Sequence, residues 1–157
     1  MIELELVGVR VELPHNQPIV LLRERNGERF LPIWIGPVEA TAIAFALQGV
    51  VTQRPMTHDL MRDLLTELGV HVDRIVVTEL REGTFYAEIQ MTQAKQAVTV
   101  SSRPSDAIAL AVRATVPIYA NEHVLAEAGI HIEEEDEDEV RRFKQFLDQV
   151  SPEDFKQ

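Results

Sequence analysis

The segment RPSDAIALAVRAT, residues 103–115, predicts a helix that is covered on two faces. Large apolar side chains alternate with alanines between Ala107 and Val112, so they project from opposite sides of a helix. Alanine is the best helix former, and its small side chain lets a neighbouring element approach closely. In a chain of this size, one of the two covering faces could come from another subunit.

A second alanine-rich segment, VEATAIAFALQG at residues 38–49, repeats this pattern. Pro37 suits the first helical position, Glu39 falls in the first turn where an acid is favoured, and Gly49 is suited to end a helix. The run AIAFAL also alternates with the period of a strand, but alanine is a poor strand former. We therefore predict a second helix here.

Strand patterns surround these helices. Residues 2–12 alternate as a strand, and Asn26-Gly27 is a strong hairpin signal between two further strand-like runs, so the chain opens as a meander of three strands. Further strands are predicted on both sides of Glu82-Gly83 and at residues 96–102 and 116–120, and further helices at residues 57–68 and 122–128. The helix at 57–68 is amphipathic, and its apolar stripe consists of Leu60, Met61, Leu64, Leu65 and Leu68.

Length and composition limit the class of protein. The 157 residues suit one domain with a real hydrophobic core, and the lack of cysteine excludes disulfides, thiolate zinc sites and cysteine nucleophiles. Glu3 and Glu5 stand where a secretory signal has basic residues, and no apolar run is long enough to span a membrane. We expect a cytoplasmic protein that neither crosses nor enters a membrane.

The net charge of −11 comes mostly from the end of the chain. Residues 1–121 hold 14 acidic and 11 basic residues, whereas residues 122–157 hold 12 acidic and 4 basic ones. Seven consecutive acids at residues 133–139 repel one another and favour water, and apolar residues then recur at helical spacing. We therefore divide the chain into a domain at residues 1–130 and an acidic linker with a C-terminal amphipathic helix at residues 131–157.

Two helix starts carry the best local signal for a binding site. Arg54-Pro55 and Arg103-Pro104 each precede a helix with an early aspartate. Open backbone N–H groups, a capping hydroxyl and an arginine together would accept a phosphate or a carboxylate. The alternative is that the arginines are neutralised by internal ion pairs. The residues concerned are Arg54, Thr57 and Asp59 in one start, Arg103, Ser105 and Asp106 in the other, and Glu39 as a further acid.

Catalytic groups can also be proposed within the helix at residues 57–68. Asp59 and Asp63 are four residues apart and share one side, where they could help to hold a divalent cation, although such a pair is also typical of a solvated face. His58 could act as a general base, or it could simply be exposed or bonded to a neighbour. The familiar phosphate-binding loops and hydrolase motifs do not occur in the sequence.

Four segments in fixed order resemble the bifunctional nuclease domain family. They are LPIWIGPVEATAIAFALQG (31–49), RPMTHDLMRDLLTELG (54–69), GTFYAEI (83–89) and SRPSDAIALAVR (102–113). The resemblance covers about residues 1–130 and implies an α+β domain with a mixed, largely antiparallel sheet. The two alanine-rich helices, the amphipathic helix and the C-terminal helix complete this expected fold. The resemblance further implies a homo-oligomer and a nuclease activity on DNA and RNA.

The resemblance places the candidate site residues within these motifs. Under this hypothesis Glu39, Asp59 and Asp106 hold a divalent metal, Mg²⁺ or Mn²⁺, and His58 moves a proton. The substrate phosphate is bound by Arg54, Thr57, Arg103 and Ser105. No organic cofactor is expected. One departure is Ser101, which stands where many members of the family have an aspartate.

Two other hypotheses stay open at this point. In the first, the protein is a non-catalytic binding or assembly module, and the same polar residues are structural caps and ion pairs. In the second, the acidic run at residues 133–139 covers an arginine-lined surface as a mimic of nucleic acid.

Overall fold

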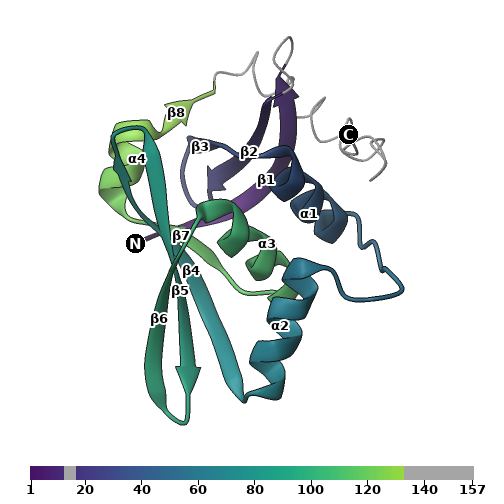
Figure 1. Cartoon of the computed structure of the whole chain (residues 1–157). Helices are drawn as coiled ribbons and strands as arrows, with labels where there is room; N and C mark the ends of the chain where they lie inside the picture. The colour runs from purple at the N-terminus through teal and green to yellow at the C-terminus, as the bar shows by residue number, and fades with distance from the viewer. Residues whose placement is uncertain (13–16, 133–157) are drawn as a thin grey trace.

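A mixed sheet of eight strands forms the frame of the molecule, in the order β6-β5-β4-β7-β1-β2-β3-β8 (Figure 1). The computed structural model describes residues 1–12 and 17–132. The strands are β1 (Ile2–Glu12), β2 (Gln17–Glu24), β3 (Arg29–Trp34), β4 (Val70–Arg81), β5 (Thr84–Gln93), β6 (Gln96–Ser102), β7 (Ile118–Ala120) and β8 (Ile130–His131). The helices are α1 (Pro37–Leu47), α2 (Thr57–Glu67), α3 (Pro104–Ala114) and α4 (Glu122–Ala128).

Strand pairing confirms the expected mixed, largely antiparallel sheet. β1, β2 and β3 form the predicted meander, with the turn at Asn26-Gly27. β4 and β7 run parallel, whereas the other adjacent pairs described are antiparallel. Two parallel neighbours need a long crossover. Here that crossover contains β5, β6 and α3, which returns the chain across the sheet and brings α3 against β4 and β5.

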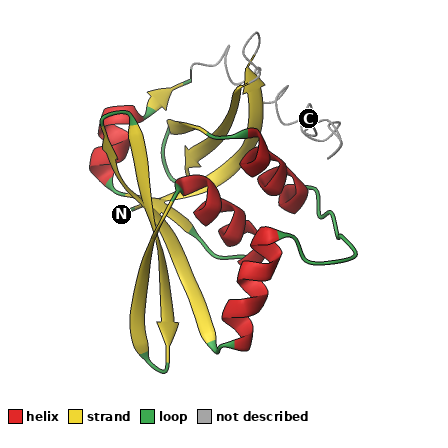
Figure 2. Cartoon of the chain, in the orientation of Figure 1, coloured by secondary structure: helices red, strands yellow, loops and turns green. Residues whose placement is uncertain are grey.

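The helices form two unequal layers (Figure 2). α1, α2 and α3 lie together on one side, where α3 contacts both of the other helices, while α4 packs against β3 and β4 on the opposite side (Figure 1). α3 is buried over most of its length, because its alanines let α1, α2 and the sheet approach closely. The two-faced burial predicted for this helix is therefore confirmed within one chain.

α1 and α2 are less covered than the sequence patterns predict. In α1 only Ala40, Ile43 and Ala44 are buried, so one face of this alanine-rich helix is open. In α2 the apolar stripe is split, because Met61 and Leu65 pack against the core whereas Leu60, Leu64 and Leu68 are exposed. The apolar arc of α2 is wider than the surface that the rest of the described chain offers to it.

The C-terminal part of the chain differs from the prediction in one strand and is otherwise largely outside the described residues. β8 was not predicted, because a strand of two residues is too short to show an alternating pattern. It pairs with Arg29 and Phe30, the first two residues of β3. The acidic run and the C-terminal helix predicted within residues 131–157 lie outside the described residues from residue 133 onward. Within the described ranges, no helix is long and apolar enough to cross a membrane.

Candidate functional site

A pocket of about 580 Å³ lies where the first turns of α1, α2 and α3 come together. Its polar lining consists of Glu39, Thr41, Thr57, His58, Arg103, Asp106 and Arg113. Pro37 and Val38 of α1 and Met56 before α2 add apolar wall. Three segments far apart in the sequence therefore bring acidic, basic and imidazole groups to one place.

A chain of ion pairs and hydrogen bonds connects the three helix starts. His58 Nε2 lies 2.9 Å from Asp106 Oδ1, which joins α2 to α3. Arg103 Nε donates to the other oxygen of Asp106 at 2.8 Å, and Arg103 Nη1 lies 2.9 Å from Glu39 Oε1 in α1. The arrangement His58–Asp106–Arg103–Glu39 therefore fixes these side chains relative to one another.

Asp106 is held in its charged form by this arrangement. Burial by itself raises the pKa of Asp106, but hydrogen bonds from Arg103 and His58 outweigh it, so the pKa lies below its usual value. An ionised Asp106 favours a proton on His58 Nε2, because that nitrogen then donates to a carboxylate. The other ring nitrogen, Nδ1, then has the lone pair that a general base requires.

Arg103 is paired inside the protein, as the alternative from the sequence required. Hydrogen bonds and the charges of Asp106 and Glu39 raise the pKa of its guanidinium, the bond to Asp106 being the strongest cause. The Arg103 side chain is nevertheless 65% exposed. One guanidinium and two carboxylates give this cluster a net formal charge of one negative, while leaving Arg103 accessible to a ligand.

A second ion pair, between Asp59 and Arg113, lies deeper behind the pocket. The Arg113 side chain is only 6% exposed. Its Nε donates to Asp59 Oδ1 at 2.8 Å, while its terminal nitrogens donate to the backbone carbonyls of Ala109 and Ala42, each at 2.9 Å. Burial raises the pKa of Asp59, but the hydrogen bonds from Arg113 and from the Met56 N–H lower it by more. The pKa of Asp59 is therefore below its usual value. Arg113 therefore fastens α1, α2 and α3 together.

Sequence reasoning missed Arg113. The available signal was its position: Arg113 follows Asp106 by seven residues, or two helical turns, in an otherwise mostly apolar helix. Arg113 therefore lies on the same side of the helix as Asp106. A charged side chain in a helix that is predicted to be buried requires a partner of opposite charge.

The three carboxylates predicted to hold a metal ion do not gather at one point. Glu39 and Asp106 line the pocket, but Asp59 instead lines a second pocket of about 480 Å³, together with Arg62 and Asp63. Among residues 1–12 and 17–132, no three His, Cys, Asp or Glu side chains are grouped so as to hold a metal ion. The predicted metal site of Glu39, Asp59 and Asp106 is therefore not formed by this part of the chain.

The three other residues predicted to bind phosphate, Arg54, Thr57 and Ser105, do not all lie in the pocket. Thr57 is exposed and lines the pocket of α1, α2 and α3, Ser105 is buried, and Arg54 is exposed but lines neither pocket described above. The pocket of α1, α2 and α3 therefore contains Arg103 but not Arg54.

The prediction that Thr57 and Ser105 cap their helices is also wrong. The N-cap positions belong to Met56 and Arg103. At the start of α2 the Asp59 carboxylate accepts the Met56 N–H at 3.1 Å, so an acid in the third helical position supplies the bond instead.

Ser101 lies on the wrong side of its strand to reach this pocket. In the pairing of β6 with β5, Ser102 is opposite the buried Ala87, whereas Ser101 is opposite Glu88. Successive residues of a strand point to opposite faces, and Ser101 is exposed and does not line the pocket. The departure from the family pattern at this position therefore leaves the pocket lining unchanged.

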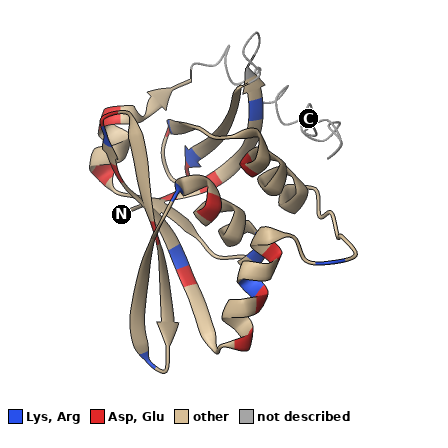
Figure 3. Cartoon of the chain, viewed as in Figure 1, with Lys and Arg blue, Asp and Glu red and all other residues tan. Residues whose placement is uncertain are grey.

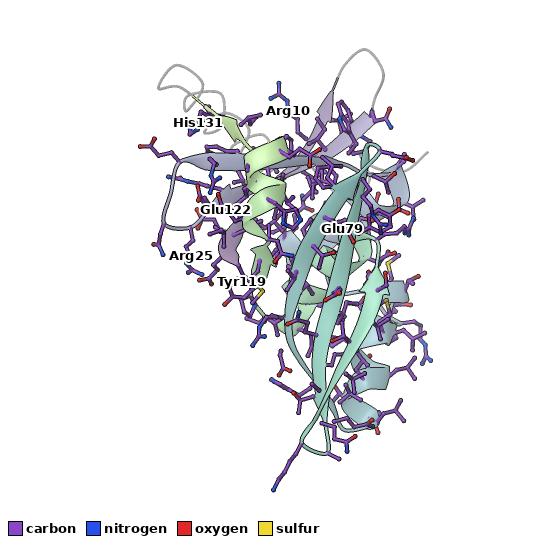
Figure 4. The ribbon with its side chains drawn as sticks, turned by 90° about the vertical axis from the view of Figure 1, so that its left-hand side faces the viewer. Arg10, Arg25, Glu79, Tyr119, Glu122 and His131 are labelled. Carbon is purple, nitrogen blue, oxygen red and sulfur yellow. The ribbon has the colours of Figure 1, made fainter. Side chains whose placement is uncertain are left out.

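Among residues 1–12 and 17–132, the arginines outside the pocket do not form a basic track. Lys and Arg are interspersed with Asp and Glu along the described elements (Figure 3). Arg25 pairs with Glu3 at 2.9 Å, and Arg29 pairs with Glu24 at 2.8 Å and Glu122 at 2.9 Å. Arg25 and Glu122 lie on the side of the molecule that carries α4 (Figure 4), away from the pocket.

Comparison with known proteins now places the chain in a family. A model of the bifunctional nuclease domain matches residues 20–133, which is more than half of the sequence. The chain belongs to the bifunctional nuclease domain family. An uncharacterized protein of Mycobacterium tuberculosis is 52% identical over 163 residues, covering 98% of this chain and 98% of the relative.

Relatives with a nuclease name are more distant. The protein called bifunctional nuclease 2 in Arabidopsis thaliana is 29% identical over 122 residues, which cover 76% of this chain and 37% of the plant protein. The protein called bifunctional nuclease 1 in Oryza sativa subsp. japonica is 24% identical over 130 residues, which cover 81% of this chain and 39% of the plant protein. This chain therefore spans well under half the length of these plant relatives.

Replacing Arg113 by methionine is expected to destabilise the fold strongly. Methionine fills a similar volume but leaves the Asp59 carboxylate and two backbone carbonyls without their donor. Breaking a buried pair from one side lowers the free energy of unfolding by about 3–5 kcal/mol. The matched control is Arg62→Met, at a more exposed pair on α2, with an expected change of about 1 kcal/mol or less. Urea unfolding measures both, and equal small losses would contradict the structural role of Arg113.

The contribution of Asp59 to stability is expected to depend on pH. Its pKa is lower in the folded protein than in the unfolded chain, so the stabilisation is present above the unfolded value of about 3.9 and is lost as pH falls through the folded value. Asp59→Asn should therefore be clearly less stable than the parent at pH 7. The difference in unfolding free energy should shrink as the pH is lowered below about 4. A difference that stays constant from pH 7 to pH 3 would show that the Asp59 charge contributes nothing.

Proposed function

We propose that this protein is a nuclease that cleaves phosphodiester bonds in DNA, RNA or both, and that the pocket at the starts of α1, α2 and α3 is its active site. Family membership supports the nuclease class. The observation that carries the choice of site is the contact of His58 with Asp106 in a pocket that also contains an exposed arginine.

In this proposal His58 acts as the general base. The Asp106 carboxylate accepts a hydrogen bond from Nε2–H and orients the ring. Nδ1 is then free to take a proton from water or from a ribose hydroxyl. The oxygen that loses this proton bonds to phosphorus, the bond from phosphorus to the leaving oxygen breaks, and the leaving oxygen takes up a proton from water. The imidazolium that forms is stabilised by the adjacent Asp106 carboxylate, as in other histidine–carboxylate pairs.

Arg103 neutralises the phosphate in the same proposal. Its guanidinium has five N–H donors, of which those on Nε and Nη1 face Asp106 and Glu39. A planar guanidinium suits the geometry of phosphate oxygens, and charge on those oxygens rises in the transition state. Glu39 acts as a positioning residue for Arg103, and Thr57 offers a hydroxyl at the exposed rim.

A requirement for a divalent cation, Mg²⁺ or Mn²⁺, is a separate proposal that comes from the sequence. Glu39 and Asp106 supply oxygen atoms in the pocket, but both carboxylates are engaged by Arg103. The third expected ligand, Asp59, is engaged by Arg113. These residues therefore do not fit a three-carboxylate metal site, and no step above is assigned to a metal.

A non-catalytic binding or assembly module is the second candidate. The observation that favours it is the pairing of Arg103 with two acids, because a cluster with one net negative charge repels a phosphate. In that case the same contacts only hold the three helices together.

Cleavage assays with matched variants separate the two candidates. Purified protein is incubated with single-stranded RNA and duplex DNA in the presence of Mg²⁺, Mn²⁺ or EDTA. We expect cleavage by the parent protein, and a loss of about 10²- to 10⁴-fold for His58→Gln, since general base catalysis contributes about that much. Glu67→Gln is the control because Glu67 is exposed on α2 and lines neither this pocket nor the one that contains Asp59, and it should keep the parent rate.

Two results would contradict the proposed active site. One is the absence of cleavage by the parent protein in every arm, which would favour the binding or assembly module. The other is unchanged cleavage by a folded His58→Gln variant, which would place the reaction elsewhere. Circular dichroism confirms that each variant is folded, and the EDTA arm reports whether a divalent cation is required.

A further inference from the structure

β6 is an unprotected edge of the sheet. It is the last strand in the order β6-β5-β4, and within the described residues it pairs only with β5 (Figure 1). Residues 96–101 of β6 are all exposed. The strand has no charged residue, no proline and no register shift against β5. Edge strands of stable proteins usually carry such features to prevent pairing with another chain, so this edge is suited to pairing.

We propose that a second copy of this chain pairs with β6 in the antiparallel direction, across a twofold axis at Thr99. This is the antiparallel register in which all seven residues of β6 have a partner. Thr99 then lies opposite the partner's Thr99, and Val98 lies opposite the partner's Val100. The two eight-stranded sheets become one continuous sheet.

The side chains of β6 are complementary to themselves in this register. Val98 and Val100 are 37% and 48% exposed, and they lie on the same sheet face because they are two residues apart. The twofold axis sets each valine opposite a valine, and β-branched residues in cross-strand pairs stabilise a sheet. Since residues 96–102 carry no charge, the pairing brings no like charges face to face along the strand.

The charges at the two ends of β6 complement each other in the same register. Lys95 lies in the exposed turn before β6, at a φ of +66°, and it is the only lysine among the described residues. In this register Lys95, which directly precedes β6, and the partner's Arg103, which directly follows the partner's β6, lie at the same end of the paired strands. The cluster of Arg103, Glu39 and Asp106 carries one net negative formal charge, so an added lysine is attracted to it. The twofold axis produces this contact twice.

This contact would complete the candidate active site. This role of the partner's Lys95 rests on the proposed function. A phosphate that approaches Arg103 also approaches two carboxylates, which opposes binding. The partner's Lys95 brings the formal charge of the cluster to zero and supplies a second cation for the phosphate. Each active site would then contain residues from two copies of the chain.

Charge reversal at Thr99 tests the dimer on the full chain. In Thr99→Lys and in Thr99→Glu, like charges face each other at the axis, which is destabilising for a strand pair. We expect each variant alone to have half the mass of the parent assembly by light scattering, relative to 17.8 kDa for one chain. An equal mixture of the two should recover the parent mass, because lysine then faces glutamate. Thr99→Val, which is uncharged and β-branched, is the control that keeps the parent mass.

Two mass results would overturn the dimer. A monomeric parent would show that β6 has no second copy as its partner. Charged variants with the parent's mass would show that the copies associate through another surface.

Lys95→Ala tests the contribution of the partner's lysine to the site. The probe is a fluorescein-labelled single-stranded DNA of twelve nucleotides. Each protein in this test also carries His58→Gln so that the probe is not cleaved, and binding is followed by fluorescence anisotropy at several salt concentrations. We expect about fivefold weaker binding and a salt dependence smaller by about 0.7 in log–log slope, as for the loss of one phosphate contact. The mass of the assembly should not change, and Lys95→Arg should bind like the parent.

The possible failures are distinguishable. Unchanged binding by Lys95→Ala would overturn the role of Lys95 while leaving nuclease activity to be judged by cleavage. A parent protein that forms the dimer but does not bind the probe would overturn both the role of Lys95 and the proposed function, and the mass measurements would still support the pairing of β6.

Discussion

The buried ion pair between Arg113 and Asp59 is the interaction on which the arrangement of the helices depends. Arg113 lies in a helix that is otherwise almost entirely enclosed, and a buried guanidinium is tolerated only when its charge and its donors are satisfied. Asp59 of α2 provides the charge, and the carbonyls of Ala42 in α1 and Ala109 in α3 accept hydrogen bonds from the terminal nitrogens. α2 must therefore start where it can reach the last turn of α3, and α1 must present Ala42 on the same side.

The site follows from this constraint, because His58 is the neighbour of Asp59. Two adjacent residues in the first turn of α2 contact two positions on α3 that are seven residues apart: Asp59 contacts Arg113, and His58 contacts Asp106. Residues two turns apart share one face of a helix, so α2 is held against α3 at two points. Arg103 then extends the contacts to Glu39 in α1. The buried ion pair and the proposed general base are thus contributed by neighbouring side chains of α2.

Local patterns in the sequence were sufficient for most of the fold. The hairpin at Asn26-Gly27, the alanine-rich helices and the strand at residues 96–102 were all predicted, because turn residues, helix formers and alternation act over short distances. The composition of the site was predicted less well, because it depends on which helix starts meet. Arg54 and Arg103 have the same local motif, yet only Arg103 reaches the pocket. Two of the three partners of Arg113, Asp59 and Ala42, are 54 and 71 positions away, a separation at which sequence patterns carry no signal.

The state of the His58 ring tests the central geometry most directly. A carboxylate oxygen lies 2.9 Å from Nε2, so the neutral ring should carry its proton on that nitrogen. Long-range proton–nitrogen correlation spectra of protein labelled with ¹⁵N-histidine distinguish the two tautomers. We predict the Nε2–H form for His58, and the loss of that preference in Asp106→Ala. A neutral His58 with its proton on Nδ1, or a preference that is unchanged in Asp106→Ala, would contradict the contact that joins α2 to α3.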